Sequence, residues 1–369
     1  MKVVLAPDGF GGTLSAREAA SAIAAGWRQE RPDDEVVEVP MSDGGEGLLD
    51  VVADAGAERL RAEVAGPLGH PCEAEWARWE DGTAVIESAL ACGLALVPEE
   101  HRNPMRATTY GVGQLIELAH RAGARRILVG LGGSATVDGG AGALLGMGWR
   151  LRTSDGSGLK IGADDLHRVV SAGPGWSAPF DDVEVELLSD VSTVLADAAR
   201  VFGPQKGASP EQVVQLTSAL EVWAEVATRD LADGARLDTS PGSGAAGGLG
   251  FALACAIGAR FTPGARAVAD LVGLPDALEG ADLVITGEGR LDATSSVGKV
   301  VGEVAGLAQR HAIAVAAVVG QQGDGAPDLA AVVAASPDGP GADPAADVRE
   351  AAAALARDAD RLGLIGDGA

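Results

Sequence analysis

The fold is decided first by residues 125–144, which read RRILVGLGGSATVDGGAGAL. An apolar run rich in β-branched residues leads directly into adjacent glycines, a pattern typical of a buried strand that ends in a tight loop. Similar runs start at Val3, Val36, Val183 and Asp282, and each closes on Gly, Asp or Pro. We therefore expect buried strands whose carboxyl ends carry glycine-rich and acidic loops.

Alanine- and leucine-rich stretches with helical spacing lie between these strands. They cover residues 15–28, 108–122, 210–231 and 299–311. Because alternating strands and helices favour parallel sheets, the predicted fold class is α/β with largely parallel sheets. A chain of 369 residues is long enough for two such domains. From about residue 323 the chain is rich in Gly and Pro, which predicts a surface loop with a last short strand before a last helix.

Composition and charge restrict the function classes. The 28 Lys and Arg residues against 53 Asp and Glu give a net charge of −25, which repels nucleic acid and anionic lipid. Three distant cysteines form no C-x-x-C pattern, and no segment is apolar enough for a membrane span or a signal peptide. The sequence predicts a cytoplasmic protein that binds neither nucleic acid nor a membrane.

The glycine-rich segment 130–144 is the first candidate site. Adjacent glycines let backbone N–H groups approach an anion, neighbouring hydroxyls add donors, and a helix expected near Gly140 adds its positive end. The predicted phosphate- or substrate-binding residues here are Gly132, Gly133, Ser134, Thr136, Asp138, Gly139 and Gly140. The segment has neither P-loop nor Rossmann spacing. A helix entry capped by its own polar residues stays the alternative interpretation.

Acidic residues at strand ends form the second candidate site. They follow the first strand at Asp8, lie in SDGGEG from Ser42, and recur at Asp190 and in TGEGRLD from Thr286. Mg²⁺ prefers a few carboxylates together with water and phosphate oxygens. The predicted metal ligands are Asp43, Glu46, Asp190 and Glu288. Each one alone is equally typical of a helix N-cap.

Few cations accompany these loops, and three lie beside glycines where an anion could approach. They are Lys206 in FGPQKGA, Arg290 in GEGRLD and Lys299 at an expected helix start. The predicted catalytic residues are therefore Asp8, Asp190, Lys206 and Arg290, with Asp292 and Lys299 added to the phosphate- or substrate-binding set. A surface lysine is more often only solvated, which is the alternative for Lys299.

Seven separated motifs together resemble those of the bacterial glycerate kinase family. In chain order they read APDGFGGTLSA from Ala6, SDGGEGL from Ser42, LGGSATVDGG from Leu131, SDVSTV from Ser189, FGPQKGA from Phe202, GSGAAGG from Gly242 and GEGRLDATSSVGK from Gly287. The resemblance runs from Lys2 to about Val319. Seven strings in one order are specific, since a shared fold alone does not produce them.

The resemblance implies transfer of the γ-phosphoryl group of ATP, with Mg²⁺, to D-glycerate, at the 2-hydroxyl to give 2-phosphoglycerate. It implies two α/β domains, one inserted into the other: a discontinuous domain of residues 1–60 and 266–369 and a flavodoxin-like inserted domain of residues 61–265. The expected partner is a small anionic substrate, glycerate or a similar hydroxy acid. A homodimer stays open.

The sequence also departs from the family's motifs. Gly9 and Gly11 stand where the family has Ser and Lys, Leu48 replaces a Thr, Val137 replaces an Asn, and an Asn-Pro-Leu string is missing after Val191. Loss of a lysine removes a charge that phosphoryl transfer would use. The alternative hypothesis is a diverged paralogue that keeps the fold and an anionic pocket but performs non-kinase chemistry or only binds.

Overall fold

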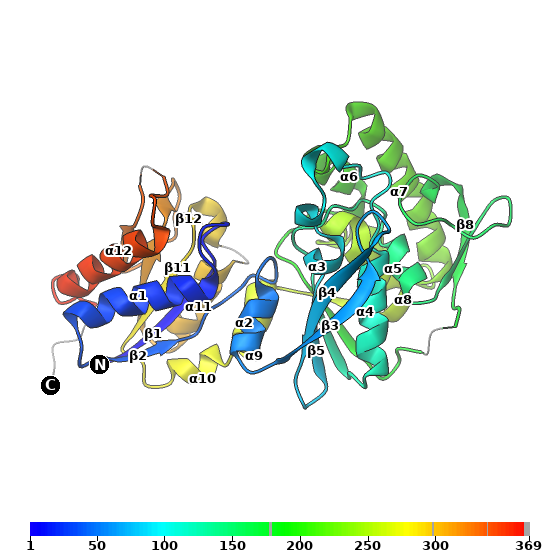
Figure 1. The fold of residues 1–369 in the computed structure, drawn as a ribbon. Helices are drawn as coiled ribbons and strands as arrows, with labels where there is room; N and C mark the ends of the chain where they lie inside the picture. Colours follow the sequence, from blue (N-terminus) through cyan, green and yellow to red (C-terminus); the bar gives the residue numbers. More distant parts are fainter. Residues whose placement is uncertain (177–178, 297–298, 338, 365–369) are drawn as a thin grey trace. The chain divides into compact units, whose positions relative to one another are not determined.

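The computed structural model describes residues 1–176, 179–296, 299–337 and 339–364, and it divides into two compact units (Figure 1). Unit 1 contains Met1–Asp43, Asp50–Ala55 and the chain from Pro263 onward. Unit 2 contains Gly44–Leu49 and Gly56–Thr262. The chain leaves unit 1 and later returns to it, so unit 2 is an insertion. Helix α2 (Leu48–Asp54) contributes residues to both units.

Unit 1 contains a five-stranded parallel sheet with the order β15-β13-β11-β1-β2. Its strands are β1 (Lys2–Pro7), β2 (Glu35–Glu38), β11 (Leu283–Gly287), β13 (Ala314–Val319) and β15 (Ala331–Ala334), and a separate parallel pair is formed by β12 (Arg290–Leu291) and β14 (Gln321–Gln322). Because the strands of the large sheet are parallel, the loops after β1, β11 and β13 leave from one edge. This edge carries Asp8 and Glu288.

Helices cover both faces of the unit 1 sheet. Helices α1 and α12 run side by side and share one core with Leu5, Ile285 and Val318 (Figure 1). Helix α11 packs Val301 against Ala317 on the opposite face. The helices of this unit are α1 (Ala16–Glu30), α9 (Gly264–Leu271), α10 (Leu274–Leu278), α11 (Val300–Arg310) and α12 (Pro344–Asp358).

Unit 2 contains a six-stranded mixed sheet with the order β10-β9-β6-β5-β4-β3. Its strands are β3 (Glu58–Ala65), β4 (Pro71–Arg78), β5 (Thr83–Glu87), β6 (Arg126–Gly130), β9 (Glu184–Leu188) and β10 (Arg260–Thr262). The pairs from β10 to β5 are parallel, whereas β4 is antiparallel to both β5 and β3. The sequence pattern did not reveal β3 and β4, since their exposed charged residues interrupt the apolar runs that marked the buried strands.

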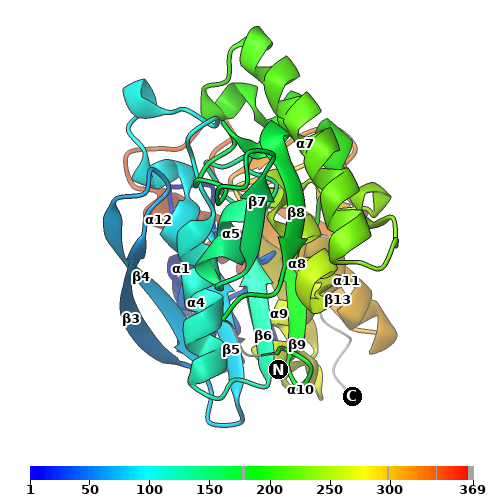
Figure 2. The same ribbon diagram turned by 90° about the vertical axis from the view of Figure 1, so that its right-hand side faces the viewer.

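The helices of unit 2 enclose one large core (Figure 2). Trp223 and Phe251 are fully buried in it, and α4 packs against α5, which in turn packs against α8. The long helix α7 begins with a capping box between Ser209 and Gln212. The helices are α3 (Ala89–Cys92), α4 (Tyr110–Arg121), α5 (Ala141–Gly146), α6 (Ala198–Phe202), α7 (Pro210–Asp230) and α8 (Leu249–Ile257).

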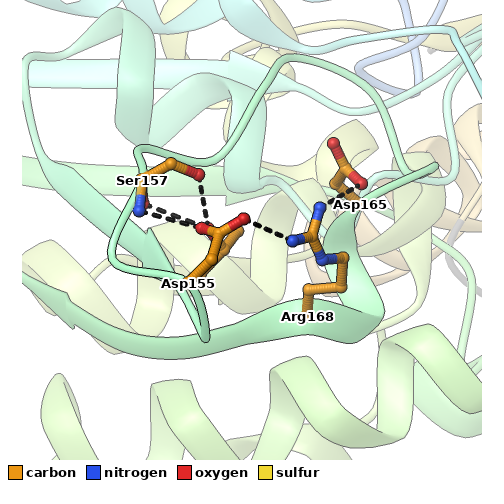
Figure 3. Close-up of polar contacts among 5 residues, drawn as sticks. Asp155, Ser157, Asp165 and Arg168 are labelled. Atoms are coloured by element: carbon orange, nitrogen blue, oxygen red, sulfur yellow. Dashed lines mark hydrogen bonds and ion pairs between the residues drawn. The ribbon is translucent and has the colours of Figure 1, made fainter.

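A short antiparallel hairpin of β7 (Arg150–Thr153) and β8 (Val169–Gly173) extends from this core. A polar cluster holds its connecting segment (Figure 3). Asp155 accepts hydrogen bonds from the backbone N–H of Ser157 (3.0 Å) and from Arg168 (2.5 Å), and Arg168 also reaches Asp165. The Ser157 hydrogen bonds and the Arg168 contact hold the pKa of Asp155 well below its usual range. All four groups are used within the cluster, which fixes the loop.

The predicted α/β class with largely parallel sheets is confirmed, as are the strands expected from Val3, Val36, Arg125, Val183 and Asp282. The helix expected over residues 210–231 is found at Pro210–Asp230. Within the described residues, no helix combines the length and the hydropathy that a membrane span requires.

Candidate active site

Three carboxylates and two cations of unit 1 line one pocket of about 420 Å³. Asp8 directly follows β1, Glu288 directly follows β11, and Asp43 comes from the loop after β2. Arg290 and Lys299 line the same pocket. Parallel strands deliver these residues to one edge of the sheet, so charges that are far apart in sequence share one small volume.

The Asp8 carboxyl is the most strongly perturbed group of this pocket. Burial and the neighbouring charges of Asp43 and Glu288 raise its pKa from 3.8 to about 8, against the lowering effects of Lys299 and of the Gly9 N–H. That N–H donates to Asp8 Oδ1 over 2.7 Å. Asp8 therefore holds a proton near neutral pH until a cation or a ligand changes its surroundings.

Glu288 has a carboxylate oxygen that no residue in the described part of the chain satisfies. The residue is 8% exposed, and its Oε1 atom is buried and accepts no hydrogen bond from any described residue. Burial raises the pKa of its carboxyl, while Ser295 and Lys299 lower it. No group of three or more His, Cys, Asp or Glu side chains with metal-binding geometry occurs among the described residues. A metal here would need further ligands from water or from a substrate.

The cations of this pocket differ in how they are held. Arg290 is 63% exposed and lies 3.4 Å from Asp292, whose carboxylate accepts hydrogen bonds from the N–H and hydroxyl of Thr294. These Thr294 hydrogen bonds lower the pKa of Asp292. Lys299 occupies the N-cap position of α11. Arg290 is thus open to a ligand, whereas Asp292 mainly stabilises its own turn.

In unit 2 the first part of the glycine-rich loop presents free donors. The backbone N–H groups of Gly132, Gly133 and Ser134 find no acceptor within the described part of the chain. Gly133 has a φ of +68°, a left-handed backbone conformation in which any residue with a side chain would be strained. Successive N–H groups around a left-handed glycine form a concavity that binds anions. This stretch fits the predicted anion contact.

The second part of the loop uses its polar groups internally. Asp138 is fully buried and accepts hydrogen bonds from the N–H groups of Thr109, Gly140 and Gly142. Gly139 N–H donates to Gly247 O, and the Thr136 hydroxyl donates to Ala246 O. The N-terminus of α5 is therefore occupied by Asp138. The capping interpretation describes these residues better than the ligand-binding one.

Lys206 lies beside this loop rather than in an open pocket. It ends a short 3₁₀ turn, Pro204–Lys206, and is 3% exposed. Its Nζ donates to Ser134 Oγ (2.9 Å) and to Thr136 O (2.7 Å). Burial lowers the pKa of its ammonium group to about 8. In this position Lys206 contacts the loop itself.

The four predicted metal ligands are divided between the units. Asp43 and Glu288 line the pocket of unit 1. Glu46 is exposed and lies in the Gly44–Leu49 segment of unit 2, and Asp190 follows β9 and is half-buried. Neither of these two lines the pocket of unit 1. Their metal-binding role stays a prediction.

Two residues of unit 2 escaped the sequence analysis. Glu87 ends β5, is 5% exposed, and accepts hydrogen bonds from the N–H groups of Gly47 and Leu49, so it holds the SDGGEG loop. An acidic residue that closes an apolar run was the available signal. Arg102 has a buried Nε that donates to no described residue, and its backbone packs against Gly207. No motif marked it.

The site and the fold together define a class of protein. Carboxylates and cations at the ends of parallel strands, and a loop lined with N–H groups, are the kinds of groups that phosphoryl transfer uses. That class is the small-molecule kinases, to which the protein belongs.

Comparisons with known proteins give the family. The sequence model of the Glycerate kinase family matches residues 3–363, and the chain belongs to this family. It is 41% identical over 326 residues to a Glycerate kinase of Haemophilus influenzae, covering 87% of this chain and 86% of the relative. It is 41% identical over 333 residues to Glycerate 2-kinase of Escherichia coli, covering 88% and 86%. A crystal structure described as glycerate kinase 2 from Salmonella typhimurium superimposes with a TM-score of 0.87 at 37% identity, covering 98% of both chains.

Proposed function

We propose that this protein transfers the γ-phosphoryl group of ATP to D-glycerate, with Mg²⁺, and forms 2-phosphoglycerate. The carrying observation is the pocket of unit 1, where Asp8, Asp43 and Glu288 meet Arg290 and Lys299. Relatives named Glycerate kinase and Glycerate 2-kinase support the acceptor. At about 40% identity over most of both chains, they do not favour the paralogue without kinase chemistry.

In this reaction Asp8 acts as the base. The 2-hydroxyl oxygen of glycerate forms the new P–O bond, the bond between the γ-phosphorus and the oxygen of ADP breaks, and the hydroxyl proton passes to Asp8. With a pKa of about 8 Asp8 is mostly protonated at pH 7, so it can accept the hydroxyl proton only after a cation bound nearby has lowered this pKa. Arg290 and Lys299 offset negative charge on the transferred group.

The carboxylates of this pocket fit a divalent cation. Glu288 Oε1 is a buried acceptor that no described residue satisfies, and burial together with the Asp43 charge raises the pKa of Asp8. Glu288 and Asp43 would hold Mg²⁺ together with water and phosphate oxygens. When bound, Mg²⁺ supplies charge neutralisation on the phosphates. This is the part of the proposal that motif resemblance and side-chain chemistry support independently.

In unit 2 the loop of Gly132, Gly133 and Ser134 would bind a second anionic group through its N–H donors. The absence of competing acceptors for these N–H groups in the described residues supports this role.

The test is ADP release from ATP and Mg²⁺ with D-glycerate, followed by ³¹P NMR of the product. We expect glycerate-dependent turnover and the resonance of 2-phosphoglycerate. A 3-phosphoglycerate resonance would overturn the assigned hydroxyl, and ATP consumption that does not depend on glycerate would overturn the acceptor. L-glycerate and tartronate serve as matched anionic controls.

A further inference from the structure

The hydrogen bonds of Lys206 determine what Ser134 can do. An ammonium group has only donors, so Ser134 Oγ must accept the 2.9 Å hydrogen bond from Lys206 Nζ. The hydroxyl proton of Ser134 is therefore directed elsewhere. No described residue accepts it. Ser134 is 6% exposed, which leaves little room for bulk solvent to take this role.

The same lysine also fixes the loop on the other side of Ala135. Its Nζ donates to Thr136 O over 2.7 Å, so two loop positions are tied to one buried group. Between the strand end and these two contacts lie the N–H groups of Gly132, Gly133 and Ser134, which have no acceptor in the part of the chain that the structure describes. Three N–H donors and one O–H donor then belong to one turn of backbone.

Charge favours the same conclusion. Lys206 is 3% exposed, and no carboxylate lies within ion-pair distance of it in the described part of the chain. The titratable groups that face it are Cys92 and Asp138. Burial raises the pKa of the Cys92 thiol to about 12, so this group stays neutral. Both carboxylate oxygens of Asp138 already accept hydrogen bonds, from the N–H groups of Thr109, Gly140 and Gly142. A ligand anion would stabilise the buried ammonium.

We propose that Lys206 is a positioning residue that turns Ser134 into a hydrogen-bond donor for an oxyanion of the substrates, the carboxylate of glycerate or a phosphate of ATP. The inference rests on the proposed function for the identity of these anions. Lys206 itself does not touch the ligand, and it acts through the Ser134 hydroxyl and the loop backbone.

The test combines Lys206→Met, Ser134→Ala and the double variant, with Lys160→Met as the matched control because Lys160 is an exposed lysine of the same unit. Dissociation constants for D-glycerate and for ATP are measured separately by calorimetry. We expect each single change to weaken one of the two ligands roughly tenfold to a hundredfold, the range for a hydrogen bond to a charged group. The double variant should bind the ligand no more weakly than Lys206→Met does, because both substitutions disrupt the same Lys206–Ser134 interaction.

Additive losses, or unchanged affinities for both ligands, would overturn the proposal. The ligand that weakens identifies the anion as carboxylate or phosphate. A wild type that shows Lys206-dependent binding but no turnover would overturn the proposed function alone, and normal turnover with unaffected variants would overturn this inference alone.

If Lys206→Met does not fold, the pH dependence of ligand binding by the wild type and by Ser134→Ala tests the positioning role of Lys206. Because the folded-state pKa of Lys206 is about 8, its ammonium loses its proton as pH rises through that value. Wild-type affinity for the anion should fall over this range, and Ser134→Ala should show a much smaller fall. Equal pH profiles for these two proteins would overturn the positioning role.

Discussion

Asp8 of unit 1 and Asp138 of unit 2 both carry carboxyl groups whose pKa is raised by burial, yet they are held in different ways. Asp138 accepts hydrogen bonds from Thr109, Gly140 and Gly142 and organises two helix starts. Asp8 accepts one from its neighbour Gly9 and shares its pocket with other carboxylates. Burial alone therefore does not mark a site.

The two regions differ in which kind of hydrogen-bonding group lacks a partner among the described residues. In the pocket of unit 1 the buried atom without a partner among the described residues is an acceptor, Glu288 Oε1, which a cation or a proton would satisfy. In the glycine-rich loop of unit 2 the groups without a partner among the described residues are donors, the N–H groups of Gly132, Gly133 and Ser134, which an anion would satisfy. The first region is suited to metal and proton chemistry and the second to anion binding.

The largest effect should follow from changing Asp8. Asp8→Asn removes the proposed base, and we expect kcat to fall by about 10²–10⁴-fold, the usual contribution of general base catalysis. KM for glycerate should change much less, because Asn keeps the size and the Gly9 hydrogen bond. Coupled ADP release measures both constants. Asp328→Asn, an exposed carboxylate of the same unit, is the matched control and should keep wild-type kcat.

Stability against pH shows whether Asp8→Asn lost its base or its fold. The pKa of Asp8 is 3.8 unfolded and about 8 folded, so the unfolded chain releases this proton first. Wild-type stability attributable to Asp8 should fall as pH rises from about 4 to about 8. The Asn variant should lack this slope and be at least as stable as wild type at pH 8 without Mg²⁺. Lower stability there would contradict the burial argument.

Mg²⁺ should stabilise unit 1 without any substrate. At one hundred times its dissociation constant, a ligand of the folded state adds about 2.7 kcal/mol to the free energy of unfolding. Glu288→Gln should reduce this increment, because it removes the charge on the unsatisfied acceptor. Thermal unfolding with Mg²⁺ or with EDTA measures it. The metal assignment fails if Glu288→Gln responds to Mg²⁺ as the Asp328→Asn control does.

Substitutions at two glycines of the loop should distinguish a role in packing from a role in anion binding. A Cβ on Gly139 would lie 2.5 Å from Trp223 Cδ1, so Gly139→Ala should lower stability by about 1–3 kcal/mol and leave ligand affinity of the folded protein unchanged. A Cβ on Gly133 would lie 3.2 Å from Ala89 Cβ, and the Gly133 N–H has no acceptor among the described residues. Gly133→Ala should cost about 1 kcal/mol through its positive φ but weaken anion binding. Urea unfolding and calorimetry would show a reversed pattern if the loop assignment is wrong.

The sequence allowed much of the fold to be predicted, because buried parallel strands combine apolar runs with sharp glycine or acidic ends. Parallel pairing also explains why Asp8 and Glu288, 280 positions apart, share a pocket. The strands β3 and β4 were missed because they contain no continuous apolar run: one side of each faces solvent, and apolar and charged residues alternate along them.

Burial could not be predicted. Lys206 and Arg290 looked alike as cations beside glycine, but tertiary packing encloses Lys206 and leaves Arg290 open. Likewise Asp138 and Asp8 are both acidic residues after buried strands, and only the surrounding hydrogen bonds distinguish them. The catalytic and metal-binding roles themselves stay predictions until the substitutions are made.

The smallest effect concerns the glycine that stands where the family has a lysine. Gly11 lines the pocket of unit 1, and a Cβ there meets no atom within 4 Å. Gly11→Lys should raise kcat on glycerate about threefold to tenfold, because the added ammonium can offset charge on the transferred phosphoryl group. Its φ of +48° makes the change cost about 1 kcal/mol of stability.

Gly12→Lys is the matched control for that gain. Gly12 also has a positive φ, +76°, and open space around its Cβ, but it does not line the pocket. Both lysines therefore carry the same charge and similar backbone strain, and only the one at position 11 faces the site. A kcat that rises equally in both variants would indicate a general electrostatic effect on this acidic protein. A kcat unchanged in both would mean that the pocket already has the positive charge it needs from Arg290 and Lys299.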